Sequence, residues 1–286
     1  MSAAAHSFET LFDQSPHTFG HANGVMLLAG ELENGGLALS IAAPLSCHAL
    51  VARRRDPVVH AASANVEGPA RLVYVMGEET LWSAWVDYVQ GVTLALREAG
   101  HDLPGFDVLV RSDLPLDAGL ASSTALVVAL LRALDAAYAI DLDDDALIAL
   151  AHRAEAAFGE APSRAAIEGC VLGDERHVVH GRERIALPDE MEATLLLGRR
   201  RPISTAVPSY RSAELDAARV EELAAALRAG ASEEIGALLD TLPGPKCELL
   251  EATRRHPSVY GARCVKEAGA VVALVRRGES RALLAA

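Results

Sequence analysis

One short segment, residues 115–126 with the sequence PLDAGLASSTAL, constrains the fold more than any other part of the chain. It joins a strand-like apolar run, residues 106–112, to a long Ala- and Leu-rich run typical of a helix, residues 122–138. Gly119 permits a positive φ and a close approach of the backbone. Successive backbone N–H groups at a helix start can bind phosphate oxygens. The segment therefore predicts a phosphate-binding loop, although an ordinary capped helix explains the same residues.

The loop also offers hydroxyl groups to a metal ion. Ser122 or Ser123 can place a hydroxyl on Mg²⁺, and the Gly-Lys-Ser/Thr of a Walker loop is absent from the segment. The residues expected to contact phosphate or nucleotide are Pro115, Ala118, Gly119, Leu120, Ala121, Ser122 and Ser123.

Charge and composition exclude several classes of function. The 286 residues are 51% hydrophobic and 23% charged, which is ordinary for a globular protein with a sizeable core. The net charge of −13 argues against nucleic acid and anionic membranes, but a nucleotide needs only a local positive pocket. The N-terminal sequence lacks the features of a signal peptide, and no apolar run reaches the length of a membrane helix, so we expect a cytoplasmic protein. The four widely spaced cysteines predict small buried side chains in a reducing compartment.

The order of strand-like and helix-like segments indicates an α+β fold. Asn34-Gly35 between two apolar runs predicts a hairpin, and alternation over residues 175–185 predicts a further strand. Helical patterns cover residues 82–99, 122–138, 144–158, 215–229, 232–242 and 247–255. Strands dominate the N-terminal half and the two element types mix later, which favours two lobes.

The loop resembles the second signature of the GHMP kinases, Pro-x-x-x-Gly-Leu-x-Ser-Ser, at every fixed position. Four other segments resemble galactokinases in order and spacing: Ser63-Ala64-Asn65, residues 85–92 (WVDYVQGV), Gly105-Phe106-Asp107 and Tyr260-Gly261-Ala262-Arg263. The resemblance implies a two-lobed α+β fold, with ATP, Mg²⁺ and a sugar-like small molecule in a cleft between the lobes. It implies lobes over residues 1–175 and 176–286 and places Trp85 at the nucleotide.

The first family signature is incomplete in this chain. Its segment, residues 23–36, holds Val25 where the resemblance implies an arginine that stabilises the transferring phosphoryl group. The histidine and aspartate that would bind sugar hydroxyls in the family are missing here, and the segment is two residues shorter than the family signature. Glu31, Glu33 and Tyr210 remain candidates for contacting a substrate.

The catalytic aspartate is also replaced. Its position holds Ile167, which cannot accept a proton, and Glu168 follows where the family has glutamine. A carboxylate on the wrong helical face misses the geometry that catalysis needs, so Glu168 is a weak candidate for a substitute base. Arg164 replaces a family glycine and is a candidate substitute for the lost arginine, or simply a solvated or pocket-filling side chain. Glu155 matches the second Mg²⁺ ligand of the family, beside Ser122 or Ser123.

The third signature has lost most of its glycines over residues 261–270, where Lys266 could supply a charge. Losing a base and an electrostatic stabiliser costs about 10²–10⁴-fold each. The sequence thus favours a degenerate galactokinase homologue, with sugar phosphotransfer lost or much reduced and with nucleotide or ligand binding possible. The alternatives are an active ATP-dependent small-molecule kinase that uses Glu31, Glu168 or substrate assistance, and another reaction in the same cleft.

Overall fold

A computed structural model describes residues 3–30, 37–66, 71–115, 118–158, 162–197, 213–242, 247–265 and 270–285. Contacts within the chain divide it into two compact units that interleave in sequence. Unit 1 comprises Met1–Ala22, Leu45–Leu114 and Ser122–Pro162, and unit 2 comprises Asn23–Pro44, Pro115–Ala121 and Ser163–Ala286. The boundary at residues 175 and 176 stays a prediction.

The sheet of unit 1 has β5 at its centre. Its strands are the C-terminal part of β2 (Ala38–Arg53), β3 (Val58–Ser63), β4 (Leu72–Val75) and β5 (Phe106–Ser112). β5 runs antiparallel to β2, with Leu50 opposite Leu109, and parallel to β3, with Ala61 opposite Val108. β3 pairs with β4 in the antiparallel sense. The first five residues of β5 are buried, which explains why its sequence is an unbroken apolar run apart from one aspartate.

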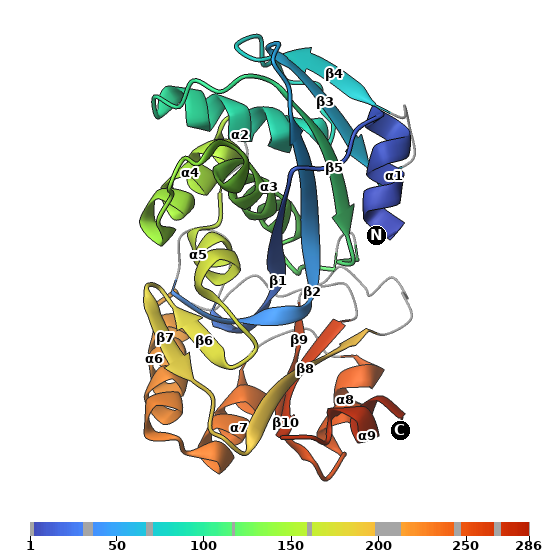
Figure 1. Cartoon of the computed structure of the whole chain (residues 1–286). Coiled ribbons are helices and arrows are strands. Elements are labelled where there is room, and N and C mark those ends of the chain that lie inside the picture. The colour runs from blue at the N-terminus through green and yellow to red at the C-terminus, as the bar shows by residue number, and fades with distance from the viewer. Residues whose placement is uncertain are drawn as a thin grey trace. The chain divides into compact units, whose positions relative to one another are not determined.

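Helices cover both faces of the unit 1 strands (Figure 1). On one face lie α2 (Val86–Glu98), α3 (Ser122–Tyr138) and α4 (Asp144–Ala156). On the other lies α1 (Ala3–Phe12), whose Phe8 packs against Leu50 and Leu109 in an apolar cluster. The bounds of β5 and α3 are those predicted from the sequence, so the strand–loop–helix order is confirmed. The loop before α3, residues 115–121, is the one predicted to bind phosphate and is called the phosphate loop below.

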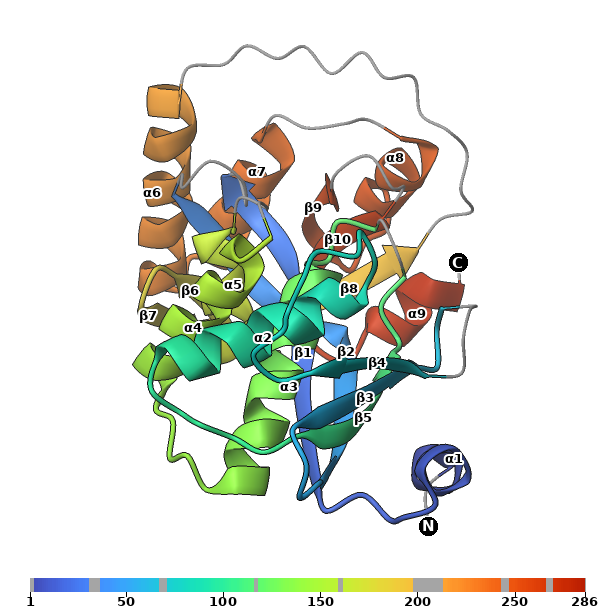
Figure 2. The same cartoon turned by 90° about the horizontal axis from the view of Figure 1, so that it is seen from above.

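α2 and α4 lie side by side at short range (Figure 2). A Cβ added to Gly91 of α2 would lie only 2.2 Å from the carbonyl oxygen of Ala154 in α4. The helices approach this closely because Gly91 has no side chain. α4 begins at Asp144, where the helical pattern predicted it, and the side chain of Asp143 before it accepts a hydrogen bond of 2.8 Å from the amide of Ala146.

Unit 2 contains the C-terminal part of β1 (Thr18–Gly30), the N-terminal part of β2, β6 (His177–His180) and β7 (Glu183–Ala186). β1 pairs with β2, as the predicted hairpin requires, and the turn with Asn34 and Gly35 lies outside the described residues. The alternation over residues 175–185 belongs to two strands, so the prediction of one strand was wrong. Gly181, with φ +58°, makes the turn between β6 and β7.

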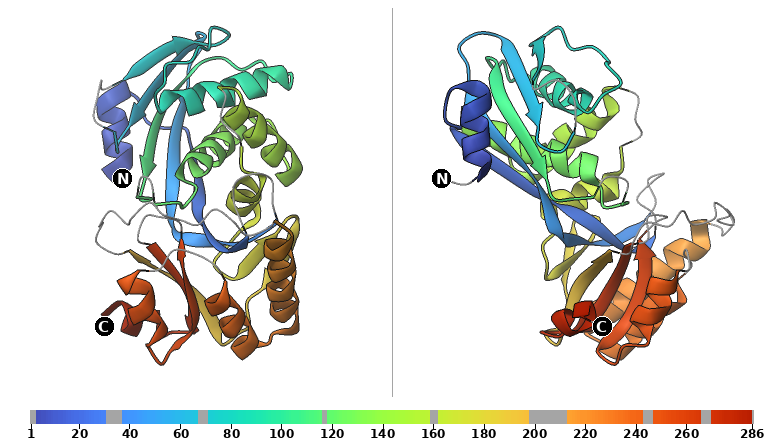
Figure 3. Two further views of the ribbon diagram at one scale, coloured as in Figure 1. Left: turned by 180° about the vertical axis from the view of Figure 1, so that it is seen from behind. Right: turned by 90° about the vertical axis from the view of Figure 1, so that its right-hand side faces the viewer.

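A second sheet of unit 2 has the order β8-β10-β9. Its strands are β8 (Met191–Leu197), β9 (Val259–Val265) and β10 (Ala270–Arg276), and the helices of the unit are α5 (Arg164–Leu172), α6 (Ala213–Ala229), α7 (Ser232–Thr241), α8 (Glu248–Arg254) and α9 (Ser280–Ala285). Figure 3 shows α8 and α9 on one face of this sheet and α7 on the other. The helices and sheets of both units confirm the α+β class. Within the described part of the chain, none of the helices has the length and apolar character needed to cross a membrane.

Candidate functional site

The phosphate loop has a left-handed backbone at two of its residues. Gly119 has φ +69°, as its role in a tight loop predicts, and Ala121 has φ +55°, which no sequence signal indicated. The carbonyl oxygen of Leu120 between them accepts a hydrogen bond of 2.9 Å from the amide of Val25 in β1. A left-handed alanine costs roughly 1–2 kcal/mol, so the surrounding contacts hold the loop in this shape. α3 begins at the next residue, Ser122, as the sequence predicted.

A buried carboxylate lies against the first turn of α3. Glu155 in α4 is 6% exposed, and its Oε1 accepts a hydrogen bond of 2.6 Å from Oγ1 of Thr124, which is 3% exposed. Ser122 and Ser123 precede Thr124 and are half-buried. Sequence reasoning named Glu155 and both serines and missed Thr124, since its partner lies 31 residues away along the chain.

A divalent metal ion in this region would have one carboxylate and hydroxyl oxygens as protein ligands. The described residues contain no group of three or more His, Cys, Asp or Glu side chains that could hold a metal ion. Mg²⁺ commonly uses one or two carboxylates and takes its remaining ligands from water and substrate phosphates. The donor set Ser122, Ser123 and Glu155 fits that pattern, and its role as an Mg²⁺ site stays a prediction.

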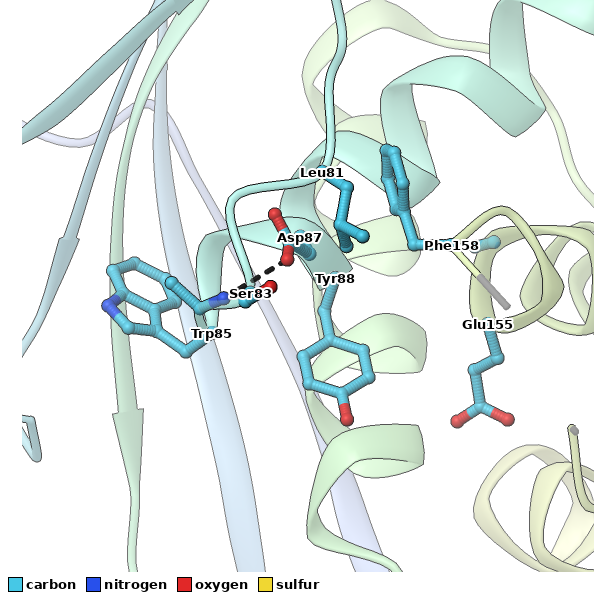
Figure 4. Close-up of a pocket in the computed structure, with 9 residues that line it drawn as sticks. Leu81, Ser83, Trp85, Asp87, Tyr88, Glu155 and Phe158 are labelled. Atoms are coloured by element: carbon cyan, nitrogen blue, oxygen red, sulfur yellow. Dashed lines mark hydrogen bonds between the residues drawn. The ribbon is translucent and has the colours of Figure 1, made fainter. Parts of the chain in front are cut away.

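A pocket of about 420 Å³ opens beside this carboxylate in unit 1 (Figure 4). Its lining combines aromatic and apolar groups with two carboxylates: Leu81, Ser83, Ala84, Trp85, Asp87, Tyr88, Ala154, Glu155 and Phe158. Figure 4 shows Tyr88 projecting from α2 and Glu155 from α4. Its volume lies in the range of about 300–1,000 Å³ that is typical of small-molecule sites, in which a few polar groups set the orientation of the ligand.

Two polar side chains of α2 hold the segment that forms one wall of the pocket. Asp87 accepts hydrogen bonds from the amides of Trp82 (2.9 Å) and Ala84 (3.0 Å). The side-chain amide of Gln90 is fully buried and makes two hydrogen bonds with the backbone of Thr80. It accepts one of 2.9 Å from the N–H of Thr80 and donates one of 2.8 Å to the carbonyl oxygen of Thr80. Sequence reasoning missed this support, and its signal was two polar residues, three positions apart, at the start of a helix most of whose residues are buried.

Val25 packs against α5 in unit 2. Val25 is fully buried, and a Cβ added to Gly169 would lie 2.9 Å from Cγ2 of Val25 and 2.9 Å from Oγ of Ser40. Ile167, two residues earlier in α5, is also fully buried. The two positions are therefore occupied by well-packed apolar side chains.

Arg164 and Glu168 form an ion pair along α5. Nε of Arg164 lies 2.9 Å from Oε1 of Glu168, an i,i+4 arrangement. The Glu168 side chain is 4% exposed, whereas that of Arg164 is 70% exposed. The buried carboxylate is thus neutralised by an arginine that lies mostly in solvent. Glu168, the candidate substitute for the base, and Arg164, the candidate substitute for the arginine, therefore bind each other.

Comparison with known proteins assigns these features to a family. The family model described as the GHMP kinases N-terminal domain matches residues 87–173. Galactokinase from Streptomyces coelicolor is 37% identical over 158 residues, which are 54% of this chain and 41% of that protein. The crystal structure of Lactococcus lactis galactokinase complexed with galactose matches with a TM-score of 0.83 and 18% identity, covering 98% of this chain and 91% of that one. Residues 87–173 thus match the N-terminal domain of the GHMP kinases, and the chain is similar to galactokinases.

The fold of the superfamily extends over almost the whole chain. The crystal structure of the Methanococcus jannaschii mevalonate kinase also matches, with a TM-score of 0.73, 16% identity and 94% coverage of both chains. The predicted GHMP kinase fold is therefore confirmed. The sequence match to the Streptomyces relative spans about two fifths of the length of that curated protein.

The GHMP family match begins at Asp87, in the segment that supports the pocket, and ends at Gly173, just after α5. It thus includes the phosphate loop, Thr124, Glu155 and the α5 ion pair. The predicted substrate contacts Glu31, Glu33 and Tyr210 lie outside the described residues, as does Lys266.

Proposed function

We propose that this galactokinase-like protein has lost sugar phosphotransfer, or retains it only at a much reduced rate, and binds a nucleotide or related ligand in the pocket of unit 1. The observation that carries the proposal is the packing of Val25 against Gly169 in α5. It fills with methyl groups the place where the family resemblance implies an arginine, next to the helix that holds the aspartate position.

Phosphoryl transfer needs a positive group on the transferring phosphate and a residue that accepts or orients a proton. Val25 and Ile167 supply neither, and both are fully buried. Each contribution is worth about 10²–10⁴-fold, so losing both predicts a rate lower by about 10⁴-fold or more.

Glu168 is poorly placed to replace the base. Its Oε1 already accepts a hydrogen bond from Arg164, and the side chain is buried on α5. To accept a proton at that oxygen, Glu168 would have to break a charge-assisted bond. The same pair occupies Arg164, the candidate substitute for the arginine.

The pocket supports retained ligand binding. Trp85, Tyr88 and Phe158 offer aromatic surface for a purine base. Glu155, Ser122 and Ser123 offer hard oxygen ligands for the Mg²⁺ that accompanies a nucleotide triphosphate. The first turn of α3 offers backbone N–H groups for phosphates. ATP with Mg²⁺ is therefore the proposed cofactor, and a sugar-like small molecule the proposed second ligand, as galactose is for the Lactococcus lactis neighbour.

Calorimetric titration of the full chain with Mg-ATP and Mg-ADP tests the binding part. We expect saturable binding that Trp85→Ala weakens by about tenfold, since stacking on an aromatic ring is worth about 1–1.5 kcal/mol. Trp82→Ala is the matched control, because Trp82 does not line the pocket. Equal loss in the two variants, or no binding by the parent chain, contradicts the proposed pocket.

A coupled assay for ADP release with a panel of hexoses, galactose included, tests the catalytic part. We expect turnover below about 10⁻² s⁻¹, whereas enzymes commonly reach 1–10³ s⁻¹. The rival proposal is an active kinase on another small molecule, and the retained left-handed loop with Glu155 favours it. Fast ADP release that depends on one sugar and is abolished by Ser122→Ala and by Glu155→Ala would establish that rival.

A further inference from the structure

Two cysteine sulphurs lie unusually close together in unit 2. The Sγ atoms of Cys247 and Cys264 are 3.0 Å apart, although the residues are 17 positions apart in sequence. Cys247 precedes α8, and its Sγ accepts a hydrogen bond of 3.4 Å from the amide of Leu250. Cys264 lies in β9, next to the last residue of that strand. A disulfide bond needs a sulphur separation of about 2.05 Å, so an approach of about 1 Å by side-chain rotation closes the gap.

The two thiols differ in access. Cys264 is 2% exposed and belongs to an apolar cluster with Leu250, Ala262 and Val271. Cys247 is half-buried and packs at the edge of the same cluster. A small reagent can therefore reach Cys247 before Cys264. The sulphur of Cys264 is more deeply buried and lies in contact with that of Cys247.

From this geometry we propose that Cys247 and Cys264 are the site of a reversible disulfide, formed by exchange with a low-molecular-weight disulfide. The Cys247 thiolate attacks one sulphur of the small disulfide, whose S–S bond breaks and releases one small thiol after protonation. The sulphur of Cys264 then loses its proton to solvent and attacks Sγ of Cys247. The bond between Cys247 and the small molecule breaks, and a second small thiol leaves. The protein loses two electrons and two protons, and one small disulfide becomes two thiols.

The second step is the slow one. In the dithiol, burial, followed by the neighbouring Cys247, raises the pKa of Cys264 to about 12, while Arg254 and Arg263 act in the opposite direction. Burial, the largest of these causes, remains after Cys247 has become a mixed disulfide. Because the thiolate is the attacking form, little of Cys264 is ready to react at neutral pH. A mixed disulfide on Cys247 should accumulate briefly before the internal bond forms.

The internal bond would tie the start of α8 to β9. The two residues are 17 positions apart in sequence, so the bond closes a loop of that length. Such a loop reduces the number of conformations open to the unfolded chain. We expect the Tm of the oxidised protein to rise by roughly 5–10 °C, as a loop of this size and a chain of this length imply.

The remaining cysteines provide internal controls. Cys47 in β2 and Cys170 in α5 are 1% and 3% exposed. Burial raises the pKa of Cys47 to about 12, which keeps this thiol protonated and unreactive. A variant with Cys47→Ala and Cys170→Ala leaves only the proposed pair.

The test treats the reduced full chain with oxidised glutathione, quenches with acid and follows intact mass, linked peptides and Tm. We expect a transient glutathione adduct, then the loss of two hydrogens with residues 247 and 264 in one linked peptide, all reversed by dithiothreitol. The Cys47→Ala/Cys170→Ala variant should behave in the same way. Cys264→Ala should stop at the adduct on Cys247, and Cys247→Ser, at the more exposed position, should give no linked peptide.

Two results overturn the proposal. One is a stable adduct on Cys247 of the parent chain with Cys264 still open to alkylation after unfolding. The other is a parent chain in which both thiols remain unmodified. Because the decisive readout is the peptide map of the parent chain, poor folding of a variant leaves the test intact.

Discussion

The hydroxyl of Thr124 donates a hydrogen bond of 2.6 Å to the carboxylate of Glu155, and both side chains are buried. The bond joins the first turn of α3 to α4, directly after the phosphate loop. It fixes the orientation of the acidic group that is the candidate metal ligand.

Replacing Thr124 with valine should destabilise the protein by about 1–3 kcal/mol, because a buried carboxylate loses a donor with no change in side-chain shape. Urea unfolding measures this loss. Thr124→Ser keeps the hydroxyl and loses one methyl group, so it should cost about 1 kcal/mol or less. If valine and serine at this position are equally stable, the bond does not support the site.

The close contact of α2 and α4 depends on Gly91. In Gly91→Ala the new Cβ would lie 2.2 Å from the carbonyl oxygen of Ala154, and a backbone atom cannot move aside cheaply. We expect a loss of about 1–3 kcal/mol in spite of the better helix propensity of alanine, together with weaker ligand binding in the adjoining pocket.

The control for this substitution is Gly100→Asn. Gly100 follows α2 with φ +90°, and an added Cβ meets no atom within 4 Å. Asparagine is the L-residue that best tolerates a positive φ, so this variant should lose about 1 kcal/mol or less to backbone strain and bind ligand like the parent. Equal effects of the two substitutions would contradict the packing argument.

The packing of Val25 on α5 predicts a compensating pair of substitutions. Gly169→Ala alone places a Cβ 2.9 Å from Cγ2 of Val25 and should cost about 1–3 kcal/mol. Val25→Ala alone should cost about 1–3 kcal/mol as a cavity. The double variant should be more stable than the sum of the single effects predicts, because the new methyl group enters the space left by valine. Strictly additive unfolding energies would show that the two residues do not share that space.

His48 should make the stability of unit 1 depend on pH. Burial lowers its pKa from the ordinary 6.5, with charged neighbours contributing less. The unfolded chain then binds more protons below about pH 6.5, so stability is complete above that pH and falls as the pH drops below it. In the His48→Gln variant, the urea midpoint should change less with pH below about 6.5 than it does in the parent. The His152→Gln variant, changed at an exposed residue, should keep the pH dependence of the parent. A slope that His48→Gln leaves unchanged would assign the effect to other groups.

Local patterns predicted the parts of the fold that depend on neighbours in sequence. β5 and α3 have the predicted bounds because an apolar run, a glycine loop and an Ala- and Leu-rich run follow one another directly. The hairpin of β6 and β7 was not recognised, since the alternating pattern continues through a short turn at Gly181.

The site depends on contacts between distant segments, which no local pattern contains. Thr124 meets Glu155 only because α3 packs on α4. The sequence indicated that Val25 and Ile167 stand where the family resemblance implies polar residues, but the packing of Val25 against α5 and the burial of Ile167 within α5 follow from the tertiary structure. The ion pair of Arg164 with Glu168 is an exception, because opposite charges four residues apart on one helix are a local pattern from which such a pair can be predicted.

The contact between Val25 and Gly169 also restricts which side chains residue 25 can accept. An arginine introduced at residue 25 would enter a space already filled by α5 and Ser40 and bring a charge into a fully buried position. Val25→Arg alone would therefore lower stability before its charge could act on any ligand. Placing a cation there would require replacements at several neighbouring residues at once, so residue 25 is coupled to its surroundings and does not vary independently of them.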